Sequence, residues 1–155
     1  MTIQVVEGDA TSPERGVIVH VVNDRGGWGK GFVNAVSRRW AEPERAYRSW
    51  ARNKTGFELG RAQIVPVGDA LFVANVLAQS GTKRVHGRPP IRYEALEKGL
   101  AEVARFCAQN RLEAHMPRIG CGLAGGTWDE VEPLIERTLV AADVPVTVYD
   151  WVPLD

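Results

Sequence analysis

The chain has 155 residues, of which 45% are hydrophobic and 25% are charged, and its 19 Lys and Arg residues balance its 19 Asp and Glu residues. This composition is typical of an ordinary folded domain and excludes a disordered chain, a fibre and a disulfide-stapled miniprotein. A formal net charge of zero also argues against bulk attraction to nucleic acid or to a membrane surface. We therefore expect one domain that covers residues 1–155.

Cysteine usage and the first residues indicate the compartment. Cys107 and Cys121 show no metal-ligand spacing, and two thiols make no disulfide framework. The chain begins with no basic segment followed by an apolar stretch, and no apolar run approaches the ~18 residues of a membrane span. We expect a cytoplasmic protein that is not attached to a membrane and that needs no metal and no cofactor.

The order of apolar patterns predicts an α/β fold. Short β-branched runs alternate with segments at helical spacing from the first residues to the last. We predict strands at residues 3–6, 17–22, 62–67, 71–78, 113–116 and 146–149, with a hairpin at Gly68 and Asp69. The predicted helices cover residues 32–40, residues 43–52, the segment that carries Leu96, Leu100, Val103 and Phe106, and residues 128–140. The pattern predicts one mixed sheet between layers of helices.

Glycine is the compositional anomaly, since 16 residues make about 10% of the chain against a usual share of about 7%. Half of the glycines lie in two windows between a predicted strand and a predicted helix, namely Gly26, Gly27, Gly29 and Gly31, and then Gly120, Gly122, Gly125 and Gly126. Backbone N–H groups and the helix dipole favour an anion at such a position, and glycine lets the backbone approach it closely. Either window alone is consistent with a plain turn, but the pair favours a diphosphate held between two loops.

The two glycine windows can be compared with two known phosphate-binding motifs, the P-loop and the dinucleotide-binding motif. The first window lacks the spacing of a P-loop, and no Ser or Thr follows Lys30 to hold Mg²⁺. Gly120, Gly122 and Gly125 match Gly-x-Gly-x-x-Gly, and Asp150 follows the next strand. However, only one helix and one strand follow this match, whereas a dinucleotide-binding fold needs several further units. A nicotinamide dehydrogenase is therefore improbable.

Five segments in a fixed order resemble the macrodomain family. They are GDAT at residues 8–11, HVVNDRGGWGKGFVNAV at 20–36, VANVLAQ at 73–79, MPRIGCGLAGGTW at 116–128 and VTVYD at 146–150. Within macrodomains they are most similar to the branch that holds the terminal ADP-ribose protein glycohydrolase, the DNA-ADP-ribosyl glycohydrolase antitoxins and the ADP-ribose-1''-phosphate phosphatase. The resemblance implies a three-layer α/β/α fold with an ADP-ribose cleft at the strand ends.

The resemblance also implies roles for individual residues. Asp9 would accept a hydrogen bond from the adenine amino group, although a turn or capping carboxylate is the alternative. Asn23 would contact the distal ribose, and Tyr149 or Trp151 would pack on the adenine. The remaining implied ligand contacts are Ala10 beside Asp9, Gly27, Trp28, Gly29, Lys30, Gly31 and Phe32 in the first glycine loop, and Gly120, Cys121, Gly122, Leu123 and Ala124 in the second.

The sequence departs from the family pattern at the two positions that carry chemistry. The terminal glycohydrolases use a lysine that attacks the anomeric carbon and an aspartate in the second glycine loop, but here Gln79 and Ala124 stand at those positions. Lys83 would need a shift of register to replace the lysine. Glutamine cannot form a Schiff base, and alanine cannot transfer protons.

Three functions remain open. In the first, a water held by the diphosphate and by groups such as Asn23 and Gln79 attacks the anomeric carbon and removes mono-ADP-ribose from an acidic protein residue or a DNA thymidine. In the second, His20 acts on ADP-ribose-1''-phosphate, against the alternative of a core histidine in a buried strand. In the third, the domain binds ADP-ribose without cleaving it.

The expected partners follow from these functions. ADP-ribose is the ligand or product, and a mono-ADP-ribosylated protein or DNA is the substrate. The loop with Lys83, Arg84, His86 and Arg88 is locally basic. It is either a solvated loop or a surface that touches the modified partner, for example a nucleic acid strand.

Overall fold

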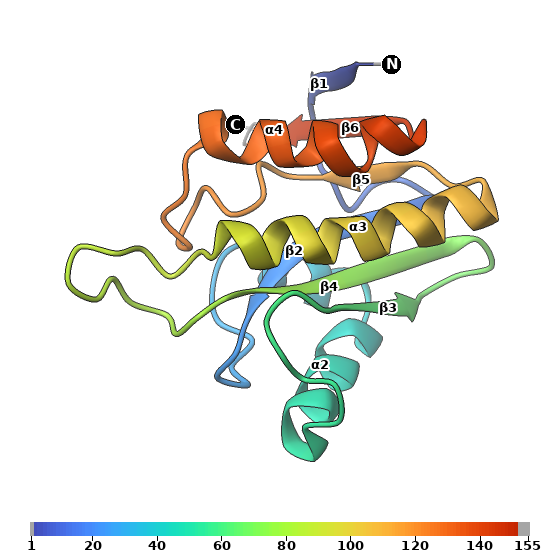
Figure 1. Cartoon of the computed structure of the whole chain (residues 1–155). Coiled ribbons are helices and arrows are strands. Elements are labelled where there is room, and N and C mark those ends of the chain that lie inside the picture. The colour runs from blue at the N-terminus through green and yellow to red at the C-terminus, as the bar shows by residue number, and fades with distance from the viewer. Residues whose placement is uncertain (1, 152–155) are drawn as a thin grey trace, which may run out of the picture.

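The computed structural model describes residues 2–151 and contains the predicted alternation of strands and helices (Figure 1). In chain order the elements are β1 (Ile3–Glu7), β2 (Gly16–Asn23), α1 (Phe32–Arg39), α2 (Glu42–Asn53), β3 (Ala62–Pro66), β4 (Leu71–Gln79), α3 (Tyr93–Asn110), β5 (Ala114–Met116), α4 (Trp128–Thr138), a 3₁₀ turn η1 (Val140–Ala142) and β6 (Val146–Asp150).

The six strands form one mixed sheet in the order β1-β6-β5-β2-β4-β3, and only β3 runs antiparallel to its neighbour. The hairpin at Gly68 and Asp69 joins β3 to β4, as predicted. Because the other strands are parallel, their carboxyl ends meet at one edge of the sheet. The loops that follow β2, β4 and β5 therefore lie together, on the left of Figure 1.

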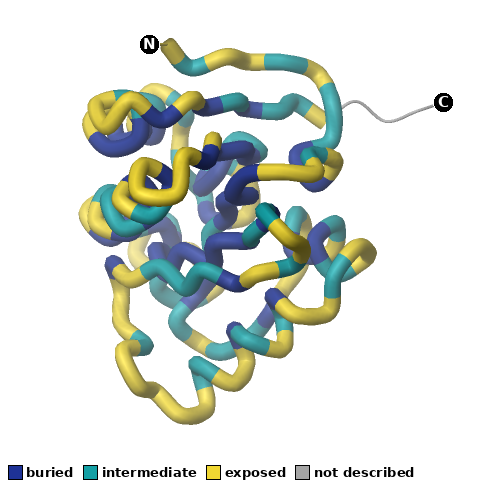
Figure 2. The backbone as a smooth tube through the Cα atoms, turned by 90° about the vertical axis from the view of Figure 1, so that its right-hand side faces the viewer, coloured by how far each residue is buried: buried dark blue, intermediate teal, exposed yellow. Residues whose placement is uncertain are grey.

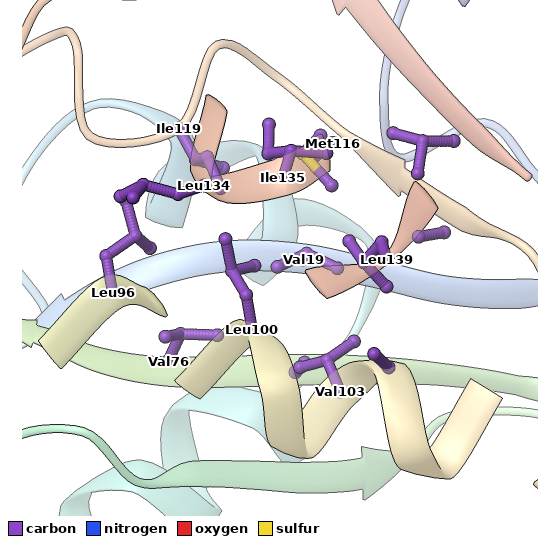
Figure 3. Packing of buried hydrophobic residues seen from close by; sticks show 14 of the residues in the cluster. Val19, Val76, Leu96, Leu100, Val103, Met116, Ile119, Leu134, Ile135 and Leu139 are labelled. Carbon is purple, nitrogen blue, oxygen red and sulfur yellow. The ribbon is translucent and has the colours of Figure 1, made fainter. Parts of the chain in front are cut away.

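Helices cover both faces of this sheet, which confirms the predicted α/β/α layers. On one face, α3 and α4 pack on Val19 and Val76, with Leu100 and Ile135 at the centre of the cluster (Figure 3). On the other face, α1 and α2 pack on Ile18, Leu77 and their neighbours. The buried residues run through the middle of the molecule, and exposed residues gather in the loops and on the outer sides of the helices (Figure 2).

Many element boundaries differ from the prediction by one residue, and the largest difference is at the last helix. The helix predicted over 128–140 ends at Thr138, and a 3₁₀ turn over Val140–Ala142 follows, with the left-handed Asp143 (φ 59°) at its end. Strand β4 continues to Gln79, one residue beyond the prediction. This extension places Gln79 at the carboxyl edge of the sheet, beside the end of β2.

Candidate functional site

A cleft runs along the carboxyl edge of the sheet and consists of two adjacent cavities that share part of their lining. Cavity A has a volume of about 260 Å³ and cavity B about 310 Å³. Both are lined by Gly31, Phe32 and Pro117, so Phe32 stands at the middle of the cleft. Gly31 has a φ of 90°, in the region that favours glycine, and this lets the chain turn directly into α1 with Phe32 facing the cleft.

Cavity A is the more apolar end of the cleft. Its walls include Ala10, Tyr149 and Trp151, so two aromatic side chains are available to contact a flat ring. The Tyr149 hydroxyl lies 2.8 Å from Nδ1 of His115, which holds the phenol ring in place. Ala10, Tyr149 and Trp151 therefore line one cavity together, and their contact with adenine stays a prediction.

Asp9 also lines cavity A, and its carboxylate has a structural role as well. Oδ1 accepts hydrogen bonds from the backbone N–H (2.8 Å) and the hydroxyl (2.7 Å) of Thr11. Oδ2 lies 3.8 Å from Arg39. One oxygen therefore stabilises the turn after β1, and the other is available to a ligand, so the two interpretations of Asp9 are compatible.

Cavity B lies between the two glycine loops. Lys30 and Gly31 line it from the first loop, and Gly120, Gly122, Leu123 and Ala124 line it from the second. His20 and Gln79 contribute from the ends of β2 and β4, and Arg118 from the loop after β5. Arg118 forms a bidentate ion pair with Asp150 (2.6 and 3.0 Å) and lies over the Trp128 ring, so it is held at the wall.

Tyr47 of α2 shapes the first glycine loop. The fully buried hydroxyl donates to the Asn23 carbonyl oxygen (2.6 Å) and accepts from the Gly26 N–H (3.1 Å). Burial raises the pKa of Tyr47 to about 12, so the hydroxyl keeps its proton. The Asn23 side chain adds a bond from Nδ2 to the Gly27 carbonyl oxygen (2.8 Å) and one to its Oδ1 from the Arg25 N–H (2.8 Å).

These contacts bear on several predictions for the first loop. The Asn23 amide holds the loop backbone and is not among the residues that line cavities A and B, so its contact with the distal ribose stays a prediction. Trp28 is a core residue that is 6% exposed, because its indole N–H donates to Ser37 Oγ (2.7 Å) and Val33 O (3.1 Å) and its ring packs on Tyr47. Gly27 and Gly29 line neither cavity either.

The second glycine loop is compact. The Gly126 N–H donates to the Gly120 carbonyl oxygen (2.7 Å), and a Cβ at Gly126 would lie only 2.5 Å from that oxygen. Gly125 packs against Pro89, and the Ile91 N–H donates to the Ala124 carbonyl oxygen (3.0 Å). Cys121 lines neither cavity, and burial raises its thiol pKa, which disfavours a nucleophilic thiolate.

Gln79 is held by a small ring of hydrogen bonds at the end of β4. Its Nε2 donates to the Gly81 carbonyl oxygen (3.1 Å), while the Gly81 N–H donates to Asp24 Oδ1 (2.8 Å) and the Asp24 N–H donates to the Gln79 carbonyl oxygen (2.9 Å). Because Gly81 offers only an acceptor to the amide, Nε2 must face it, and Oε1 is left as the acceptor for cavity B. Lys83 lies in the exposed loop beyond this ring and does not line the cleft.

His20 belongs to a buried polar row that crosses the sheet on the α1 and α2 face. Asn75 Nδ2 donates to Gln63 Oε1 (3.0 Å) and Pro43 O (3.1 Å), so Asn75 Oδ1 accepts from His20 Nε2 (2.6 Å). The proton therefore sits on Nε2, and Nδ1 is a buried acceptor without a hydrogen-bond partner in residues 2–151. Burial lowers the pKa of His20 to about 4, so the ring is neutral at physiological pH.

This burial predicts an acid-sensitive contribution of His20 to stability. Because the folded pKa of about 4 is below the unfolded value near 6.5, the contribution is complete above pH 6.5 and is lost as the pH falls toward 4. Between pH 7 and about pH 5, the wild type should lose about 2 kcal/mol more unfolding free energy than the His20→Gln variant. Urea titrations at both pH values would measure this, with the exposed-loop variant His86→Gln as control. An equal loss in the wild type and His20→Gln would contradict the burial of a neutral ring.

Solved structures of similar proteins share this fold. A macrodomain protein from Streptomyces coelicolor is 51% identical, with a TM-score of 0.85 and coverage of 96% of this chain and 98% of that chain. The chain belongs to the macrodomain family. A protein of unknown function from Bacteroides thetaiotaomicron is 48% identical to this macrodomain, with a TM-score of 0.94 over 97% of this chain and 98% of that one. No family model matches.

Curated relatives of this macrodomain include larger proteins. The mouse chromodomain-helicase-DNA-binding protein 1-like is 32% identical over 96% of this chain. This chain spans only 18% of the length of the mouse protein and 15% of the length of the zebrafish protein of the same name. The bovine ADP-ribose glycohydrolase OARD1 is 26% identical over 95% of this chain and 90% of its own length. The DNA ADP-ribosyl glycohydrolase of Thermus aquaticus is 28% identical over 96% of this chain and 41% of its own.

Two further features were searched for within residues 2–151. No helix within residues 2–151 is long and apolar enough to cross a membrane. Within the same range, no three His, Cys, Asp or Glu side chains are grouped closely enough to hold a metal ion.

The sequence patterns did not point to several residues that shape this site. Tyr47, Asp24 and Arg118 shape the loops or the wall of the cleft, and each acts through contacts with segments that lie well apart in the chain. Asp24 had one visible signal, because it directly follows Asn23 at the predicted strand end. Tyr47 had none, since an aromatic residue in an amphipathic helix is ordinarily a core residue.

Proposed function

We propose that this macrodomain binds ADP-ribose along the cleft and hydrolyses the bond between ADP-ribose and a modified target. The observation that carries the proposal is the pair of adjacent cavities at the carboxyl edge of the sheet, one of which lies between the two glycine loops. Adenine would occupy cavity A, the diphosphate would cross beside Gly31, and the distal ribose would occupy cavity B. The curated relatives named as glycohydrolases support a hydrolase.

The groups in the cleft suit this orientation. Tyr149 and Trp151 offer ring faces to adenine, and Oδ2 of Asp9, which lies 3.8 Å from Arg39, would accept a hydrogen bond from its amino group. Lys30 lines cavity B and supplies positive charge close to Gly31 and to the amino end of α1. A diphosphate at this point would gain both a cation and backbone N–H groups.

In the proposed reaction, the Gln79 amide oxygen orients a water toward the anomeric carbon of the distal ribose. The water oxygen bonds to that carbon, the bond to the target breaks, and the water loses one proton to solvent or to the departing base. A carboxylate leaving group requires no protonation at neutral pH. The bound diphosphate stabilises the oxocarbenium-like transition state, and fixed geometry lowers the entropic barrier, so no side-chain base and no lysine adduct are required.

ADP-ribose-1''-phosphate phosphatase activity is the second candidate, and it would depend on His20. The buried polar row disfavours it, since a neutral His20 whose Nε2 proton is committed to Asn75 has no proton to donate to a phosphate ester. The third candidate is a domain that only binds ADP-ribose. This binding-only function is supported by Gln79 and Ala124, which stand where the terminal glycohydrolases have their catalytic lysine and aspartate.

One set of measurements tests the proposal. Calorimetry with free ADP-ribose should show binding, and the absence of heat and of a thermal shift at millimolar ligand would reject all three functions. Incubation with glutamate-ADP-ribosylated protein, thymidine-ADP-ribosylated DNA and ADP-ribose-1''-phosphate should then release free ADP-ribose from a macromolecule and leave the phosphate ester intact. Release of inorganic phosphate alone would favour the phosphatase, and binding without any product would favour a reader.

A further inference from the structure

The loops around the cleft have a charge distribution that the balanced net charge conceals. Residues 25–39, 79–93 and 117–127 contain nine of the chain's 19 Lys and Arg residues and none of its 19 Asp and Glu residues. These three segments follow β2, β4 and β5 at one end of the sheet (Figure 1), and each contributes residues to the lining of the cleft. The carboxylates that neutralise them are supplied by neighbouring segments, and they neutralise only three of the nine cations.

Those three cations are paired. Arg25, Arg39 and Arg118 each have a carboxylate within 4.0 Å, on Asp24, Asp9 and Asp150 respectively. Within residues 2–151, the other six form no ion pair at that distance, namely Lys30, Arg38, Lys83, Arg84, Arg88 and Arg92.

Three of these unpaired cations, Lys83, Arg84 and Arg88, belong to the exposed loop after Gln79, at the distal end of the cleft. We call these three residues the basic rim. Lys30 lines cavity B beside Gly31, where the proposed function assigns it to the diphosphate.

The exposed loop is fixed against the wall of cavity B. Ser80 N–H donates to Pro90 O (2.9 Å), and Ile91 N–H donates to the carbonyl oxygen of Ala124, a lining residue. An Arg84 guanidinium nitrogen lies 3.5 Å from the position of a Cβ on Gly125. The basic rim is therefore a defined surface beside the end of the cleft where a target attached to the distal ribose would emerge.

We propose that the basic rim binds the phosphate backbone of a single-stranded nucleic acid that carries the ADP-ribosyl group. The inference rests on the proposed function, because that function places the bond to the target in cavity B. It selects one of the two target classes, nucleic acid, over the acidic residues of a protein. The rim offers three unpaired cations, and the carboxylate at its base, on Asp24, is already engaged by the Gly81 N–H and by Arg25. Such a surface complements a polymer of one sign, whereas a protein surface usually presents both signs.

Apolar side chains on the same rim are consistent with this partner. Val85 is 59% exposed and lies between Arg84 and His86, and Leu123 is 69% exposed on the facing glycine loop. Exposed aliphatic groups between cations can contact unstacked bases. However, neither residue is aromatic, so stacking adds little and binding should depend mainly on phosphate contacts. We therefore expect a dissociation constant of roughly 10⁻⁴ to 10⁻⁶ M at physiological salt, with little sequence preference.

The test uses a fluorescein-labelled oligothymidylate of about 20 nucleotides, longer than the ~4–16 nucleotides that a small domain covers. Each phosphate contact with a single strand contributes about 0.7 to the slope of log K against log salt, so three contacts predict a slope near −2. The triple variant Lys83→Gln, Arg84→Gln, Arg88→Gln should reduce this slope to about 0 and weaken binding at about 50 mM salt on the order of 100-fold.

The control carries the same loss of charge elsewhere. The triple variant Arg45→Gln, Arg52→Gln, Arg105→Gln removes three exposed helix arginines, and it should retain the wild-type slope. Both triple variants should bind free ADP-ribose within about twofold of wild type, because none of the six residues lines the cleft. Unchanged melting temperatures would show that both variants fold.

Three results would overturn the proposal. They are no binding of the wild type at low salt, equal slopes for the two triple variants, and binding of polyglutamate as tight as that of the oligonucleotide. The last of these would assign the rim to acidic protein targets. Calorimetry with ADP-ribose separates the two proposals, since oligonucleotide binding by the rim without ADP-ribose binding would reject the proposed function and leave the rim assignment intact.

Discussion

Replacing Gly122 with glutamate should abolish ADP-ribose binding and leave the fold intact. Gly122 lines cavity B, its φ lies outside the left-handed region, and a Cβ there would meet no other atom within 4 Å. The backbone therefore accepts a side chain, and the new carboxylate extends into the space assigned to the diphosphate and distal ribose. Repulsion between unit charges about 5 Å apart is about 3 kcal/mol at an effective dielectric constant near 20, so affinity should fall at least 100-fold in calorimetry.

The choice of glycine decides whether this experiment is informative. A side chain at Gly126 would collide with the Gly120 carbonyl oxygen, so loss of binding there would report a broken loop. The control is Gly68→Glu, which adds the same charge at an exposed hairpin glycine without a positive φ. Wild-type affinity in Gly122→Glu, with both variants melting as wild type, would reject the assignment of the second glycine loop to the diphosphate.

Local patterns predicted the fold well because each layer leaves its own signature in this chain. The run from Val17 to Val22 is apolar on both faces, and the structure buries it in the centre of a mainly parallel sheet. The two glycine windows were informative for the same reason, since a strand-to-helix loop is recognisable from its neighbours. Their convergence on cavity B at Gly31 and Gly120 follows from parallel strands that end at one edge.

Side-chain roles that depend on distant segments were not predictable in the same way. Trp28 looked like a site residue because glycines flank it, yet Ser37 of α1 and Tyr47 of α2 draw its indole into the core. Asn23 looked like a ligand contact alone, but its amide also holds the turn that follows it. In both cases the competing partner became visible only when the helices packed on the sheet.

The role of His20 could not be decided from the sequence alone. A histidine in a buried strand is consistent with a core residue or with a catalytic one, and its sequence neighbours do not distinguish them. The deciding contacts come from Asn75 and, through it, Gln63, which are 55 and 43 residues away along the chain. Amide groups can fix a tautomer without adding charge, so the row sets the His20 tautomer while burial keeps the ring neutral, and together they disfavour a role in acid catalysis.

Gln79 should be required for turnover and not for ligand affinity. In the proposed reaction its Oε1 holds the attacking water, so Gln79→Ala should lower kcat on the order of 100-fold, the cost of misplacing a reacting group by about 1 Å. The dissociation constant for free ADP-ribose should stay within about threefold, because the loops and cavity A supply the binding groups. A change confined to KM would show instead that Gln79 binds the ligand.

Asp24 offers a way to test the orientation of Gln79 separately from its presence. Its carboxylate holds the Gly81 N–H, and Gly81 in turn fixes the Gln79 amide. Asp24→Ala should therefore lower kcat about tenfold with unchanged affinity for ADP-ribose, and Asp24→Asn should restore most of the rate because its side-chain oxygen still accepts the bond. The Gln79 side-chain amide signal in a ¹⁵N-correlated NMR spectrum should shift in the alanine variant and return in the asparagine variant. If the rate fell equally in both variants while this signal stayed fixed, Asp24 would act by its charge, and the positioning role would be wrong.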